Sequence, residues 1–83
     1  MTFNRYKRLG FAEARPVTDE EIQERASYLI KQGISISQED QINGSPKRGD
    51  MIARNPKNHK DQWLIAKEYF EANFEKDING KSN

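Results

Sequence analysis

The stretch TDEEIQERASYLIKQG, Thr18 to Gly33, is the part of the sequence most informative about the fold. Thr18 and Glu21 are spaced as in a capping box, where each side chain accepts a hydrogen bond from the other residue's backbone N–H. Gly33 is a typical C-terminal stop, because glycine readily adopts positive φ. Between cap and stop, apolar residues recur at the spacing of one helix face: Ile22, Ala26, Leu29 and Ile30. The pattern predicts an amphipathic helix over about 19–32.

Short alternating segments on both sides of this helix are typical of strands. The segment 11–15 alternates and is followed by Pro16, and the segment 34–37 alternates apolar and hydroxyl residues. Two further strands are predicted over 51–54 and 62–65, joined by a hairpin loop of roughly seven residues.

Two shorter helical segments complete the prediction. Ser37 is a candidate N-cap for a single helical turn at the start of a polar, turn-rich stretch that ends at Asp50. A short helix over about 67–75 is expected to turn three aromatic residues toward the core: Tyr69, Phe70 and Phe74.

The predicted fold class is α+β, with a small antiparallel sheet packed by the helix over about 19–32 and by the short helix near the end. Residues 1–76 are expected to form a single domain, followed by a frayed tail over 77–83. A short edge strand, either 11–15 or 34–37, could pair with a second copy, so a homo-oligomer is possible.

Composition excludes several classes of protein. The chain has 83 residues, 34% hydrophobic and 33% charged, with eight aromatic residues, enough for one lean core. It contains no cysteine and one histidine, so it can form neither a disulfide nor a multi-histidine metal site within one chain. No apolar run approaches the roughly 20 residues needed to cross a bilayer, so no membrane contact is expected.

Charge is segregated along the chain although the net charge is only +1. Residues 1–17 carry +3 and residues 45–67 carry +4, whereas residues 18–44 carry −4 and residues 68–83 carry −2. If the two basic segments pack side by side, they form a cationic face suited to nucleic acid. Alternatively, pairing with the acidic helices neutralises them within the chain.

Basic residues interleaved with aromatic and turn residues form the candidate site. A tyrosine lies among three cations near the N-terminus, a pattern that combines phosphate neutralisation with a stacking surface, although Tyr6 and Phe3 could instead dock the N-terminus on the core. The candidate contacts to RNA or to a protein partner are Arg5, Tyr6, Lys7, Arg8, Arg15, Lys47, Arg48, Arg54, Lys57, His59 and Lys60.

Catalytic and metal chemistry have weak support. His59 has no evident nucleophile to activate, so an enzyme is not expected. Glu39 and Asp40 with Asp50 superficially match a calcium loop but lack its first aspartate, its final glutamate and the preceding helix. The sequence therefore predicts no cofactor and no metal.

The string GDMIARNPKNHKDQWLIA, residues 49–66, followed by Tyr69-Phe70 and Asn73-Phe74, resembles small accessory proteins of T-even-like tailed bacteriophages. The segments 6–16, 34–37 and 40–49 fit the same pattern, so the resemblance covers most of the chain.

That resemblance implies a non-catalytic protein that counters a host defence in the cytoplasm of the infected bacterium. One group of such proteins inhibits the endoribonuclease toxin of a toxin–antitoxin system together with RNA, so a host protein effector and RNA are the expected partners. The alternative is a protein-only interaction module, either a virion accessory protein or a regulator of a host enzyme.

Overall fold

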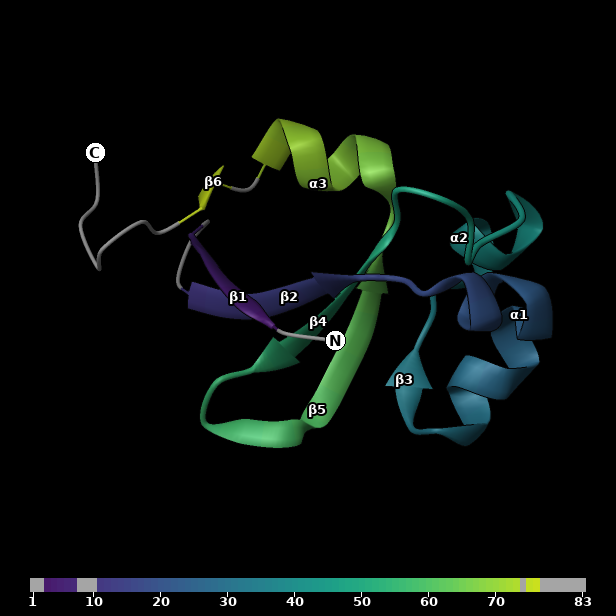
Figure 1. Cartoon of the computed structure of the whole chain (residues 1–83), viewed down its shortest axis with the longest axis horizontal. Coiled ribbons are helices and arrows are strands. Elements are labelled where there is room, and N and C mark those ends of the chain that lie inside the picture. Colours follow the sequence, from purple (N-terminus) through teal and green to yellow (C-terminus); the bar gives the residue numbers. More distant parts are fainter. Residues whose placement is uncertain (1–2, 8–10, 74, 77–83) are drawn as a thin grey trace.

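The computed structural model describes residues 3–7, 11–73 and 75–76 of the chain (Figure 1). In chain order the elements are β1 (Asn4–Lys7), β2 (Phe11–Pro16), α1 (Asp19–Lys31), β3 (Ile34–Ser35), α2 (Gln38–Ile42), β4 (Met51–Asn55), β5 (Asn58–Ile65), α3 (Lys67–Asn73) and β6 (Glu75–Lys76).

The strands form one sheet in the order β3-β5-β4-β2-β1-β6. The predicted α+β class is confirmed, but the sheet is mixed and not wholly antiparallel, because β3 pairs with β5 in parallel. β2 and β5 are each antiparallel to β4, so β2 and β3 run in the same direction. A helix is the usual connection between strands of the same direction, and α1 makes that crossover.

The sheet order changes the assignment of edges. The predicted edge strand 11–15 is wrong, since β2 lies between β1 and β4. β1 was not evident in the sequence, because its residues are mostly polar and it exists through pairing with β2 and β6. β3 does lie at an edge.

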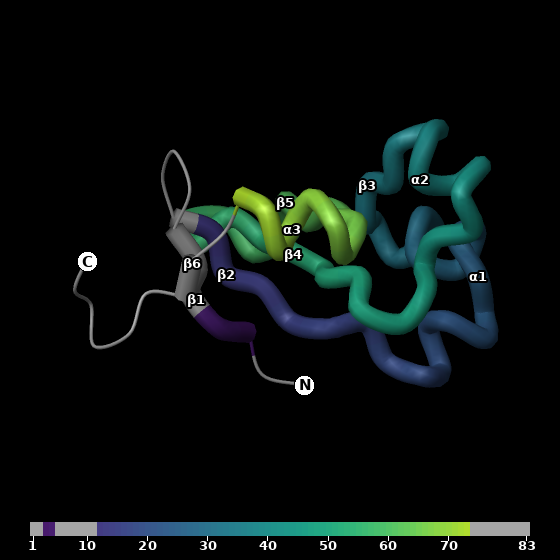
Figure 2. The backbone as a smooth tube through the Cα atoms, turned by 90° about the horizontal axis from the view of Figure 1, so that it is seen from above, coloured from purple at the N-terminus to yellow at the C-terminus, as the bar shows by residue number. Residues whose placement is uncertain are grey.

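The two faces of the sheet pack against different helices. Ile52 lies opposite Leu64 on one face, and Leu29 of α1 packs with them there. On the other face Met51 lies opposite Ile65, and Phe70 of α3 packs against both. Figures 1 and 2 show α1 and α2 gathered at one end of the molecule and α3 alongside β4 and β5.

The first helix begins as predicted but bends in its middle. Thr18 Oγ1 accepts from the Glu21 backbone N–H at 3.1 Å, and the Glu21 carboxylate accepts from the Thr18 N–H at 2.9 Å. Arg25 has φ 76° and ψ 180°, far from helical values, which shifts the phase of the residues after it. Ile30, predicted to face the core, is therefore 46% exposed, while Tyr28 packs against the core.

The hairpin is tighter than its polar sequence suggests. β4 ends at Asn55 and β5 begins at Asn58, so the predicted seven-residue loop is wrong. Arg54 lies opposite Gln62 while Asn55 lies opposite Asn58, so the register shifts and β5 bulges in between. The polar side chains of this segment reflect exposure to solvent, which backbone pairing tolerates.

The last helix is shorter than predicted and only partly buried. It ends at Asn73, because Glu75 and Lys76 instead pair with β1, opposite Lys7 and Tyr6. Phe70 packs against the core as predicted, whereas Tyr69 is 43% exposed. Phe74 and the tail over 77–83 lie outside the described residues.

A buried carboxylate fixes the loop before β4 and the start of α3. Asp50 is fully buried; its Oδ2 accepts from Ser45 Oγ at 2.6 Å and from the Lys47 N–H at 3.0 Å, and its Oδ1 accepts from the Lys67 N–H at 3.0 Å. Gly49 has φ +97°, and a Cβ there would lie 2.6 Å from the Lys67 side chain. Ser37 caps α2 as predicted, its Oγ accepting from the Asp40 N–H at 3.1 Å.

Candidate functional site

The predicted contact residues whose side chains the structure describes do not form a single face. Lys47 and Arg48 belong to the loop between α2 and β4. Figure 1 shows α1 and α2 at the other end of the molecule from the turn between β4 and β5. Three residues of the N-terminal group, Arg5, Tyr6 and Lys7, lie on β1, and for them the structure describes the backbone alone. Arg8 lies outside the described residues.

One row of charged and polar residues does run across the sheet. Arg5, Glu13, Arg54 and Gln62 occupy successive register positions on β1, β2, β4 and β5. The two basic segments therefore meet in this row, as the hypothesis of a shared surface requires, but with a carboxylate between them. Arg54 Nε donates to Glu13 Oε1 at 2.7 Å.

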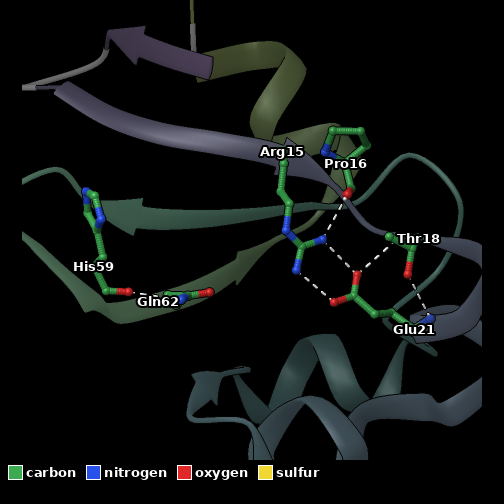
Figure 3. Close-up of polar contacts among 6 residues, drawn as sticks. All are labelled: Arg15, Pro16, Thr18, Glu21, His59 and Gln62. Carbon is green, nitrogen blue, oxygen red and sulfur yellow. Dashed lines mark hydrogen bonds and ion pairs between the residues drawn. The ribbon is translucent and has the colours of Figure 1, made fainter. Parts of the chain in front are cut away.

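His59 belongs to the same group. Its Nε2 lies 3.4 Å from Glu13 Oε1, and its side chain is 55% exposed. The carboxylate of Glu13 thus lies close to both Arg54 and His59, and the side chains of Glu13 and Arg54 are only about one-quarter exposed. The backbone carbonyl of His59 accepts from Gln62 Nε2 at 2.9 Å, which fixes the bulge in β5 (Figure 3).

The ring of Phe3 lies close to two guanidinium groups. The Cζ of Arg54 is 4.1 Å and that of Arg15 is 5.4 Å from the centre of its ring. The ring also packs against the core on the α1 side of the sheet, so this aromatic residue docks the N-terminal segment. Docking of the N-terminus on the core was the alternative to a nucleic-acid contact for Phe3.

Arg15 is part of the framework and not of an open surface. Its two terminal nitrogens donate to the two carboxylate oxygens of Glu21 at 2.8 Å each, and both side chains are only 12% exposed (Figure 3). This bidentate pair, chiefly through the Arg15 hydrogen bonds, lowers the pKa of Glu21, against a smaller opposing effect of burial.

Arg48 is paired too, but weakly. Its Nη2 lies 3.1 Å from Asp19 Oδ1, and both side chains are more than 80% exposed, where an ion pair contributes little. Arg15, Arg48 and Arg54 are therefore all matched by acidic residues from β2 and α1. For these three arginines, the intrachain pairing considered above is what the structure contains.

Three predicted residues remain open to solvent at the hairpin. We call Lys57, His59 and Lys60 the hairpin tip. All three are exposed, and within the described residues neither lysine makes an ion pair. Asn55 and Asn58 hold the turn, their Oδ1 atoms accepting from the Lys57 N–H at 2.9 Å and the Lys60 N–H at 3.2 Å.

A pocket that the sequence did not reveal lies between α2, the end of β5 and α3. Its volume is about 600 Å³. Two aromatic side chains, Trp63 and Tyr69, and three carboxylates, Glu39, Asp40 and Glu68, are among its lining residues. The only feature of the sequence that pointed to this pocket was the acidic charge of residues 18–44. The pocket itself forms only when the fold brings residues 37–43 next to residues 63–69. We call it the acidic pocket.

The described part of the chain does not bring a set of metal ligands together. No group of three or more His, Asp or Glu residues there is placed to hold a metal ion. Asp50, considered for a calcium loop, is already occupied by three hydrogen-bond donors. No helix among the described residues is long and apolar enough to cross a membrane.

Comparison with known proteins adds no relative. No family model, no curated protein and no solved structure matches the chain.

Proposed function

We propose that the protein is a non-catalytic binding protein whose hairpin tip contacts RNA. The observation that carries the proposal is the pair of exposed lysines, Lys57 and Lys60, which no acidic residue neutralises within the described residues. Lysines of this kind bind phosphate and release counterions from the nucleic acid. Arg5 and Arg54 lie in one register row across the same sheet and bring further basic residues to it.

The biological setting that we propose follows the resemblance to phage accessory proteins. There the protein would act in the cytoplasm of an infected bacterium and antagonise a host endoribonuclease toxin, with RNA in the complex. A small RNA-contacting surface without catalytic groups suits an inhibitor that binds beside the nucleic acid.

The proposal is tested with a fluorescently labelled single-stranded RNA of mixed sequence, titrated with the protein at several salt concentrations. The double variant Lys57→Gln/Lys60→Gln should bind more weakly at low salt. Its slope of log K against log salt should be smaller by about 1.4, because each phosphate contact on a single strand contributes about 0.7.

The matched control is Lys31→Gln/Lys47→Gln, which removes the same charge at the other end of the molecule and should leave the slope unchanged. Equal weakening by both variants would show nonspecific attraction to the net charge. Absence of RNA binding by the unmodified protein would contradict the proposal.

The protein-only alternative is favoured by a different observation. Ile42, on α2, is 78% exposed, and Tyr69 is 43% exposed, as expected for contacts with another protein. Purification at low salt without nuclease separates the two. RNA that co-purifies and is removed in about 1 M salt supports the proposed function, whereas a protein free of RNA in both conditions supports the alternative.

A further inference from the structure

The acidic pocket combines features that together define a ligand. The aromatic residues Trp63 and Tyr69 and the acidic residues Glu39, Asp40 and Glu68 line the same space. Within the described residues, none of these three carboxylates has an ion-pair partner. Aromatic faces next to carboxylates attract a cation, and guanidinium groups in particular, by cation–π contact and charge.

The negative charge of the acidic pocket also excludes RNA, the partner proposed for the hairpin tip, as its ligand. Three carboxylates repel phosphate, so RNA is not the occupant of this pocket. The volume, about 600 Å³, lies in the range of ligand-binding pockets and is larger than one side chain requires. The occupant is therefore a cationic group together with the chain that carries it.

An exposed apolar residue next to the pocket points to a protein. Ile42 follows Glu39 by three residues on α2, so the two side chains lie on the same side of the helix. It is 78% exposed, an unusual position for a large apolar side chain in the described part of the molecule. A partner peptide that places a basic side chain in the pocket would cover Ile42 with an apolar neighbour.

We infer that the acidic pocket binds an arginine or lysine side chain presented by a basic segment of a partner protein, with Ile42 forming the apolar border of the contact. This surface is separate from the hairpin tip, which lies at the other end of β5 (Figure 1). A protein and an RNA could thus be held at the same time. The inference does not depend on RNA binding.

The test uses a capped peptide, acetyl-Gly-Arg-Leu-Arg-Gly-amide, and the same peptide with citrulline in place of both arginines. Citrulline keeps the shape of arginine and removes its charge. Amide resonances of the ¹⁵N-labelled protein should shift saturably within residues 37–43 and 63–69 on addition of the arginine peptide. Trp63, the single tryptophan of the chain, should report the same titration by fluorescence.

The variant Glu39→Gln/Glu68→Gln should weaken the peptide roughly tenfold, in line with the loss of two charge contacts to a partly desolvated cation. The control Glu20→Gln/Glu24→Gln removes the same charge from exposed positions of α1 and should leave the affinity unchanged. Tyr69→Ala should also weaken binding, and circular dichroism should confirm that each variant is folded.

Equal binding of the citrulline peptide would overturn the inference, because charge would then play no part. So would shifts of residues 37–43 and 63–69 on addition of single-stranded RNA, which would make nucleic acid the occupant. The variant Lys57→Gln/Lys60→Gln should keep full affinity for the arginine peptide, so failure of the proposed function and failure of this inference give different results.

Discussion

Asp50 shows how one residue can determine a loop. A carboxylate without access to water is costly, and here three donors from three different positions offset the cost. The sequence could not reveal this role, because Lys67 is distant along the chain. The Thr18–Glu21 cap was predictable, since both partners lie within one helical turn.

Replacing Asp50 with asparagine should lower the free energy of unfolding by about 3 kcal/mol, because the amide nitrogen cannot accept the bonds that a carboxylate oxygen accepts. Urea denaturation checks the value. The control Asp61→Asn, at an exposed position, should change stability by less than about 0.5 kcal/mol. A similar effect of the two substitutions would mean that the buried hydrogen bonds contribute nothing.

Glu21 should make stability depend on pH in a definite direction. Its pKa in the folded protein lies below the usual 4.5, so its ion pair with Arg15 stabilises the fold above that value and is lost as the pH falls through the lowered pKa. Glu21→Gln keeps a capping side chain but loses the charge, and should cost about 1 kcal/mol at pH 7.

Unfolding curves of the native protein and Glu21→Gln, measured from pH 7 down to pH 3, test this expectation. The difference between them should be constant down to about pH 5 and should shrink below pH 4.5. If the difference in stability between the two proteins grew on acidification, the lowered pKa of Glu21 would be contradicted. Glu24→Gln, exposed on the same helix, should stay within about 0.5 kcal/mol of the native protein at pH 7.

At the scale of elements, local chemistry predicted the ends of α1 and missed its middle. Thr18 and Gly33 mark the helix by side-chain hydrogen bonding and by positive φ, both of which depend on the residue alone. β1 exists because it pairs with β2 and β6, and β6 exists because it pairs with β1, which no local pattern encodes. The strand character of 58–61 was likewise hidden by polar side chains.

The bend in α1 leads to a prediction about Arg25. Its backbone, at φ 76° and ψ 180°, lies in a region that glycine alone enters without strain. Arg25→Gly should therefore raise the free energy of unfolding by about 1 kcal/mol, the strain removed being larger than the entropy that glycine adds to the unfolded chain. Thermal unfolding followed by circular dichroism measures the change.

Glu24→Gly is the matched control for Arg25→Gly, because its position is exposed and has helical geometry. It should lower stability by about 1 kcal/mol. If both glycine variants were less stable than the native protein, α1 would be straight in solution.

For the whole molecule, one sheet carries two cores. Leu29 of α1 and Phe70 of α3 pack on opposite faces of the same strands, so neither helix has a core of its own. The charge pattern along the sequence left two alternatives open, a shared cationic face or pairing of the basic segments with acidic ones. Which arginine pairs with which acid depends on how the helices and strands are arranged. The acidic pocket could not be predicted either, because it too depends on how α2, β5 and α3 are arranged in the fold.

A shared sheet should make the domain unfold as a unit. Trp63 packs on the α3 side, whereas far-ultraviolet circular dichroism is dominated by α1 and therefore reports the other side. Urea transitions followed by the two signals should coincide, with the same midpoint and slope. Loss of the tryptophan signal at lower urea than the helical signal would show that the two faces unfold separately.

The hydrogen bonds around Asp50 also bear on how distant relatives could be recognised. Ser45 must supply a hydroxyl, Asp50 must supply two acceptor oxygens, and position 49 has φ +97°, a backbone conformation that residues other than glycine rarely adopt. Lysines and glutamates on the surface can be substituted with little effect on the fold, whereas the spacing of Ser45, Gly49 and Asp50 is constrained by the geometry of these hydrogen bonds. The pattern to search for is Ser-x-x-x-Gly-Asp, followed by a strand, a polar hairpin and a second strand that leads into a helix. Such a search tests for distant relatives that overall sequence similarity does not detect.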